Sequence, residues 1–150
     1  MRRGIYVQTH HGTIVDVSGA GVLLRGPSGC GKSDLALRLM DRGATLIADD
    51  RYLVRSGSRA PVAWAPEELY GLLEVRGLGI QSLPAIKTTR LRLVVDLVSL
   101  AEVPRLPESN ETEICGHKLP TVRLNAFEPS APLKIELAVS DPSRIGREDI

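Results

Sequence analysis

Aromatic side chains are scarce in this sequence of 150 residues, which has one Trp, one Phe and three Tyr. Proteins that bind single-stranded nucleic acid stack the bases on aromatic side chains, so this composition argues against that function. Charge is nearly balanced, with 19 Lys and Arg against 18 Asp and Glu and a net charge of +1. Binding to nucleic acid or to an anionic membrane depends on a basic excess. We therefore expect neither kind of partner.

Long apolar runs are missing as well. No run approaches the ~20 residues that cross a bilayer, and the N-terminus lacks the apolar stretch of a secretory signal. The two cysteines, Cys30 and Cys115, are too few for a disulfide framework. We expect a single domain over residues 1–150 in the reducing cytoplasm, with residues 141–150 as a flexible tail.

One segment matches G-x-x-x-x-G-K-[ST], the phosphate-binding loop, at every fixed position. Its residues are Gly26, Pro27, Ser28, Gly29, Cys30, Gly31, Lys32 and Ser33. The apolar run 21–25 before it reads as a buried strand. Residues 34–42 after it are good helix formers, and Gly43 is a typical helix stop. Strand, glycine loop and helix follow in the order that nucleotide binding requires.

Phosphate chemistry follows from this loop. Glycines let successive backbone N–H groups point into one concavity, and the helix adds its positive N-terminal end. Lys32 would reach the β- and γ-phosphates, and the Ser33 hydroxyl would bind Mg²⁺. The alternative is a tight turn with a surface lysine.

Two adjacent carboxylates, Asp49 and Asp50, follow the short strand 45–48. Open α/β sheets bind ligands at the carboxyl ends of their strands. One carboxylate could hold Mg²⁺ and the other could accept a hydroxyl proton, or both could belong to a solvated turn. Asp96, within the apolar strand 93–98, competes for the metal-side role.

Two further polar groups have open interpretations. Glu74 and Arg76 alternate with apolar residues, so on a strand both would point to one face. Glu74 could bind Mg²⁺ and Arg76 could bind phosphate, or the two could form a surface ion pair. His11 lies at a bend, where a turn histidine with no role is favoured on local grounds.

The remaining elements are expected from apolar patterning and turn residues. Residues 130–139 could be helix or strand, and Ser130 followed by Pro132 favours a helix. We expect strands over 5–9 and 13–17, an apolar segment over 69–75, a loop over 105–112, and hairpins over 52–65 and 113–119.

Together these blocks resemble the catalytic domain of bacterial HPr kinase/phosphorylase, over about residues 11–139. The blocks are His11-Gly12, the phosphate loop 26–33, Ala48-Asp49-Asp50, the signature-like segment 73–80 and, more weakly, Pro120-Thr121-Val122-Arg123. The resemblance implies an α/β fold: a P-loop-containing, PEP carboxykinase-like mixed β-sheet core with flanking helices. It also implies a kinase that uses ATP and Mg²⁺ to phosphorylate a serine of an HPr-like phosphocarrier protein, thereby regulating the phosphotransferase system.

Residue roles also come from the resemblance. Asp50 would accept the proton in the kinase direction and donate it in the reverse direction. His11 and Lys32 would act on phosphate, and Arg123 would stabilise transferring charge. Mg²⁺ would be held by Ser33 and Glu74. Supporting residues would be Asp49, Arg76 and Gly77.

The sequence departs from the family in two places. The N-terminal domain of long members is missing, so we expect either a short natural form or a truncated piece of a longer protein, and Met1 as a start favours the short natural form. Leu124-Asn125-Ala126 replaces a glycine-containing run, and little of the final helix is present. That helix is tied to the phosphate-dependent reverse reaction, so the kinase direction is better supported. Family members form hexamers. The alternative functions are a P-loop small-molecule kinase and a non-catalytic ATP-sensing module.

Overall fold

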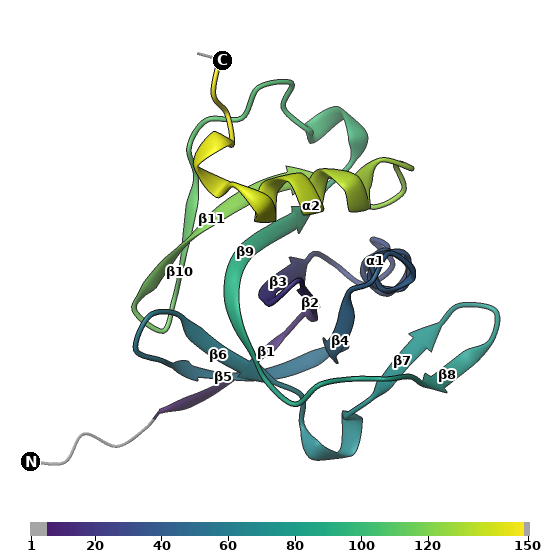
Figure 1. Ribbon diagram of the computed structural model, residues 1–150. Helices are drawn as coiled ribbons and strands as arrows, with labels where there is room; N and C mark the ends of the chain where they lie inside the picture. Colours follow the sequence, from purple (N-terminus) through teal and green to yellow (C-terminus); the bar gives the residue numbers. More distant parts are fainter. Residues whose placement is uncertain (1–5, 149–150) are drawn as a thin grey trace, which may run out of the picture.

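A mixed sheet of nine strands organises the computed structural model, which describes residues 6–148 (Figure 1). Its strands run in the order β1–β5–β6–β9–β3–β2–β4, and β11 pairs with β9 and with β10. The strands are β1 (Val7–His11), β2 (Thr13–Val17), β3 (Ala20–Arg25), β4 (Thr45–Ala48), β5 (Arg51–Ser56), β6 (Pro61–Trp64), β9 (Thr89–Leu97), β10 (Glu111–Ile114) and β11 (His117–Leu124). A separate hairpin is formed by β7 (Leu72–Val75) and β8 (Gly79–Ser82).

The centre of the sheet is parallel. β9 pairs in parallel with β3 on one side and with β11 on the other. Successive residues of β3, from Val22 to Leu24, are fully buried, as expected for a strand covered on both faces. The carboxyl ends of β3, β9 and β11 therefore meet at one edge, and the phosphate loop follows β3 at that edge.

The two α-helices cover the same face of this sheet. α1 (Lys32–Asp41) packs Leu35 and Leu39 into one core cluster, and α2 (Ala131–Ser140) packs Ile135 into it. On the opposite face, the centre of the sheet packs against residues of β5, β6, β10 and β11, which are strands of the same sheet, in a second cluster that contains Tyr52. Both layers are visible in Figure 1, where α2 crosses β9 and β11.

Most predicted elements are confirmed. α1 ends as expected at Gly43, whose φ is +108° and whose amide donates to the carbonyl of Met40 at 3.0 Å. The segment 131–140 is a helix, although the Ser130 side chain makes no capping hydrogen bond. Its apolar alternation fits a helix that buries Ile135 and leaves Leu137 72% exposed.

Several boundaries differ from prediction. His10 and His11 belong to β1 and not to a bend, because His11 is held in register with Arg51 of β5. Residues 67–69 form a 3₁₀ turn, and β7 begins only at Leu72. β9 starts at Thr89, so it includes the basic stretch before the apolar run. β10 begins at Glu111, within the predicted loop.

The ends of the chain carry predictions that the described residues address only in part. Ile5, predicted to start a strand, lies outside the described residues. Pro142–Arg144 form a 3₁₀ turn, and Ile145 packs against the first core cluster. The single domain and the flexible tail remain predictions.

Candidate active site

The phosphate loop joins β3 directly to the N-terminus of α1. Gly29 and Gly31 have φ values of +83° and +96°, a left-handed conformation that side chains with a Cβ rarely adopt. The Lys32 ammonium donates to the carbonyls of Gly26 at 2.6 Å and of Pro27 at 3.1 Å, so this side chain folds back along the loop. The loop thus brings a lysine, several glycines and a helix N-terminus together, a combination that suits phosphate binding.

Asp49 is the polar centre of the site. This residue is 9% exposed directly after β4, and its carboxylate accepts three hydrogen bonds. Oδ1 accepts from the Ser33 hydroxyl and from the Thr13 hydroxyl, each at 2.9 Å. Oδ2 accepts from the backbone amide of Glu74 at 3.3 Å. One buried carboxylate therefore links the start of α1, β2 and β7.

Asp50, the next residue, lies in a different environment. It is exposed and has a φ of +70°, and the Arg51 amide donates across it to the Asp49 carbonyl at 2.8 Å. Asp50 is therefore the central residue of a three-residue turn, a strained conformation for a residue with a Cβ. The Gly12 amide donates to the Asp50 carbonyl at 3.0 Å, which holds this turn next to His11.

The signature-like segment forms the β7–β8 hairpin at the lower right of Figure 1. Glu74 lies in β7, and its amide contact with Asp49 joins the hairpin to the phosphate loop through the Ser33 hydrogen bond. Arg76 and Gly77 lie in the exposed turn between the strands, where Gly77 has a φ of +93°. The structure therefore brings Glu74 into the site by its backbone.

His11 borders a cleft of about 460 Å³ between β1, β5 and the β10–β11 hairpin. Arg25, the residue before the phosphate loop, lines the same cleft together with Tyr52. Burial raises the pKa of the Tyr52 hydroxyl, and the positive charge of Arg25 opposes that rise. The cleft thus extends to the residue that precedes the loop.

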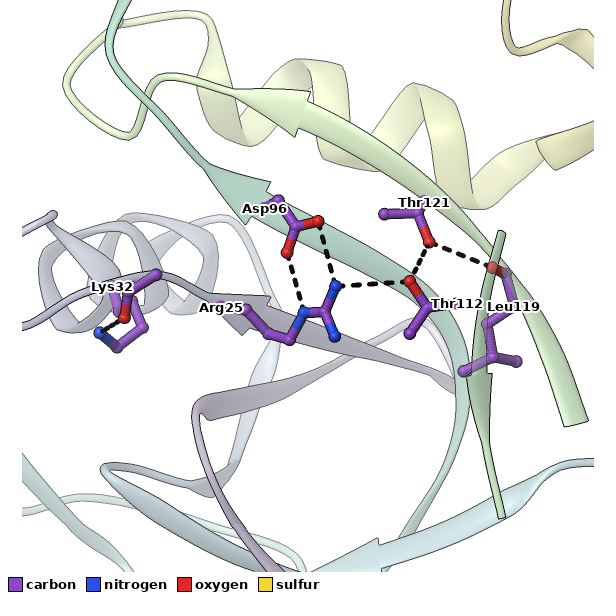
Figure 2. Close-up of polar contacts among 7 residues, drawn as sticks. Arg25, Lys32, Asp96, Thr112, Leu119 and Thr121 are labelled. Atoms are coloured by element: carbon purple, nitrogen blue, oxygen red, sulfur yellow. Dashed lines mark hydrogen bonds and ion pairs between the residues drawn. The ribbon is translucent and has the colours of Figure 1, made fainter. Parts of the chain in front are cut away.

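Arg25 and Asp96 form a bidentate ion pair across β3 and β9. Nε of Arg25 donates to Oδ1 of Asp96 at 2.8 Å, and one terminal nitrogen donates to Oδ2 at 3.1 Å. Figure 2 shows the guanidinium between Asp96 and the Thr112 hydroxyl, which is 2.7 Å from the hydroxyl of Thr121. Lys32 lies apart from this network. Both oxygens of Asp96 therefore bind Arg25, which argues against a metal-side role for Asp96.

Arg123 is exposed near the end of β11, in register with Asp96. Hydrogen bonds from Ser99 lower the pKa of Glu102, and the charge of Arg123 lowers it further. Because β11 pairs in parallel with β9, and β9 with β3, Arg123 lies at the same carboxyl-terminal end of the strands as the phosphate loop, two strands away from it. Within residues 6–148, no hydrogen bond or ion pair joins it to Lys32 or Asp50.

Sequence reasoning missed Thr13 as a part of this site. Threonine is common in strands, and nothing in its neighbours indicates a buried carboxylate 36 residues away. It also missed the pairing of Arg25 with Asp96, although a charged residue that ends an apolar strand was an available signal.

Comparison with known proteins agrees with this arrangement. Residues 6–141 match the family described as HPr Serine kinase C-terminal domain. The chain belongs to this family.

Members and relatives of the HPr serine kinase family resemble this chain over most of its length. A protein of Lactobacillus acidophilus named HPr kinase/phosphorylase is 41% identical over 126 residues, which are 76% of this chain and 39% of that protein. One of Burkholderia lata with the same name is 42% identical over 119 residues, which are 72% of this chain and 37% of that protein. This chain spans less than half the length of these curated relatives.

The predicted fold class is confirmed by a solved structure. The HPr(Ser) kinase/phosphatase of Coxiella burnetii superposes with a TM-score of 0.79 and is 25% identical, covering 91% of this chain and 90% of that one.

The donor set fits a magnesium nucleotide. Mg²⁺ prefers oxygen ligands and commonly takes one or two protein groups together with phosphate oxygens. The Ser33 hydroxyl and the Asp49 carboxylate are of this kind, and Glu74, whose backbone amide contacts Asp49, carries a further carboxylate. Over residues 6–148, no group of three or more His, Cys, Asp or Glu is arranged to hold a metal ion. No helix in that range is long and apolar enough to cross a membrane.

Proposed function

We propose that this member of the HPr serine kinase C-terminal domain family is an ATP- and Mg²⁺-dependent protein-serine kinase that phosphorylates an HPr-like phosphocarrier protein. The observation that supports it most is the hydrogen bond from Ser33 to Asp49, next to the exposed Asp50. The Ser33 hydroxyl, an oxygen of the phosphate loop that can bind Mg²⁺, is thereby hydrogen-bonded to the neighbour of Asp50. Asp50 itself is exposed to an acceptor serine. Regulation of the phosphotransferase system from the cytoplasm follows from this proposal.

Asp50 is the proposed proton acceptor. The acceptor serine oxygen forms a bond to the γ-phosphorus, and the bond from that phosphorus to the β,γ-bridging oxygen breaks. The serine proton passes to the Asp50 carboxylate, which is exposed and held by the turn described above. Asp49 cannot take this role as readily, because its oxygens already accept three hydrogen bonds.

The other site residues supply charge and position. Lys32 would leave the loop carbonyls and bind the β- and γ-phosphates, while His11 and Arg123 would bind the transferring phosphate. Mg²⁺, held by Ser33 and Glu74, would neutralise charge on the phosphate oxygens. Supporting contacts would come from Asp49, and from Arg76 and Gly77 in the hairpin turn.

The reverse reaction is proposed with the same residues. Inorganic phosphate would attack the phosphoserine phosphorus, pyrophosphate would form, and Asp50 would return the proton to the serine oxygen. Assembly into a hexamer is proposed from the family resemblance.

The test is transfer of γ-labelled phosphate from Mg-ATP to an HPr-like phosphocarrier with its candidate serine intact or changed to alanine. We expect label on the intact protein only, and loss of that label with pyrophosphate formation when phosphate is added. ATP binding without any label would contradict the kinase function and favour a sensor. Label on small molecules instead would favour a small-molecule kinase.

Lys32→Ala tests the role of the loop lysine in both ATP binding and phosphoryl transfer. We expect weaker ATP binding and weaker phosphoryl transfer, because the Lys32 ammonium would contact the phosphates both in bound ATP and in the transition state of transfer. Normal affinity together with normal turnover would remove Lys32 from the site. Lys118→Ala, on β11 in the β10–β11 hairpin, is a matched control that removes an exposed lysine elsewhere.

A further inference from the structure

The single phenylalanine of the chain stands exposed beside the phosphate loop. The Phe127 side chain is 65% exposed, in the connection between β11 and α2. A Cβ added at Gly31 would lie 3.1 Å from two carbon atoms of the Phe127 ring. The ring therefore borders the residue that precedes Lys32, where α1 begins and the phosphates would bind.

The backbone on both sides of this ring is held firmly. The Asn125 side chain donates to the Val98 carbonyl at 3.0 Å and accepts from the Phe127 amide at 3.0 Å. Arg38 of α1 donates to the carbonyls of Ala126 and, at 3.2 Å, of Glu128. An exposed ring on an anchored backbone keeps its position at little entropic cost when a ligand packs on it.

We propose that Phe127 is the surface on which the nucleotide base stacks, and hence a determinant of nucleotide affinity. The inference rests on the proposed function, because it needs a nucleotide in the phosphate loop. The sugar and base of that nucleotide extend beyond the phosphates, and Phe127 lies at the rim of the loop. A phenyl ring makes no hydrogen bond, so it contributes by stacking alone.

Other exposed aromatic residues are less suited to this role. The hydroxyl of Tyr70 donates to the Ala85 carbonyl at 2.8 Å, beside the β7–β8 hairpin. Tyr6 precedes β1. Among the described residues that carry a substantially exposed aromatic ring, Phe127 is the one whose ring would meet a Cβ at Gly31 of the phosphate loop.

The experiment compares a ligand that has a base with one that lacks it. Calorimetric titrations with ATP and with inorganic triphosphate, both with Mg²⁺, are made on the parent chain and on Phe127→Ala. We expect Phe127→Ala to weaken ATP binding by about 5- to 150-fold and to leave triphosphate binding unchanged. Phe127→Trp should retain ATP affinity, because it restores a stacking surface.

Leu137→Ala is the matched control, since Leu137 on α2 is an exposed apolar residue that the site does not use. It should change neither affinity. Equal losses of ATP and triphosphate binding in Phe127→Ala would overturn the inference, because the loop itself would then be damaged. Unchanged ATP affinity in that variant would overturn the inference alone. A parent chain that binds neither ligand would overturn the proposed function as well.

Discussion

The Ser33 hydroxyl donates a hydrogen bond to Oδ1 of Asp49 at 2.9 Å, which joins the first turn of α1 to the end of β4. Asp49 is buried, so this contact and the other two that it accepts compensate the removal of its charge from water. The hydrogen bond therefore has two roles, one in the stability of the fold and one in the position of the Ser33 oxygen.

Asp49→Asn should impair both roles. An amide group in place of Oδ2 would face the Glu74 amide, a donor against a donor. We expect the free energy of unfolding to fall by about 1–3 kcal/mol, and a higher Mg²⁺ concentration for half-maximal ATP binding. Chemical denaturation and a magnesium titration measure these effects. Asp16→Asn is the control: Asp16 also accepts two hydrogen bonds, so only stability should fall. Parent-like behaviour of Asp49→Asn in both assays would refute the role of this carboxylate.

Thr13→Val tests the second donor to the same oxygen. Thr13 is fully buried, and valine has nearly its shape, so the main change is the lost hydroxyl. We expect a loss of about 1–3 kcal/mol in unfolding free energy and a shift in the Mg²⁺ dependence of ATP binding. Thr13→Ser keeps the hydroxyl and should preserve the Mg²⁺ dependence. The same Mg²⁺ dependence in Thr13→Val as in the parent would confine Thr13 to a structural role.

Asp50→Asn should remove phosphoryl transfer while leaving ATP binding largely intact. Asp50 is exposed, follows the residue that binds Ser33 of the phosphate loop, and is the proposed proton acceptor, so transfer should fall by about 10²- to 10⁴-fold. Initial rates of label transfer and an ATP titration measure the two effects. Asp41→Asn, a change of the same charge at the exposed end of α1, should leave both unchanged. Equal turnover in Asp50→Asn and the parent would exclude Asp50 from the mechanism.

Arg25 and Asp96 should show energetic coupling in a double-mutant cycle. Their side chains are 37% and 31% exposed, so solvent screens the pair in part. From unfolding free energies of Arg25→Met, Asp96→Asn and the double variant, we expect a coupling of about 0.5–3 kcal/mol. Additive effects of the two single changes would show that the bidentate contact contributes nothing.

Gly31→Ala should destabilise the chain more than Gly19→Ala. Both glycines have positive φ, +96° and +89°, so backbone strain of about 1–3 kcal/mol applies to each. A Cβ at Gly31 would also lie 2.9 Å from Cβ of Ala126, whereas no atom lies within 4 Å at Gly19. Thermal unfolding should show a larger loss of stability for Gly31→Ala than for Gly19→Ala. ATP titration should show weaker ATP binding for Gly31→Ala and unchanged binding for Gly19→Ala. Equal losses would mean that the contact with Ala126 is easily relieved.

Sequence reasoning went furthest where contacts are short in sequence. The phosphate loop, α1 and the stop at Gly43 were predicted because glycine conformations and helix ends depend on a few neighbouring residues. The strand that precedes Asp49 was also predicted. It did not find the pairing of Arg25 with Asp96, which are 71 residues apart, nor Thr13 beneath the site. Such contacts depend on which strands pair and in which register, and a local pattern does not contain that information.

By itself, the sequence determined that a phosphate-binding loop begins a helix and that two carboxylates end a nearby strand. The tertiary structure decided which of the two carboxylates is buried and which is exposed. The antiparallel pairing of β4 with β2 and the turn at Arg51 direct Asp49 inward to Ser33 and Thr13, and they leave Asp50 exposed at a φ of +70°. Asp49 and Asp50 have the same side chain but differ in burial and in hydrogen-bond partners. These two properties set what a carboxylate can do.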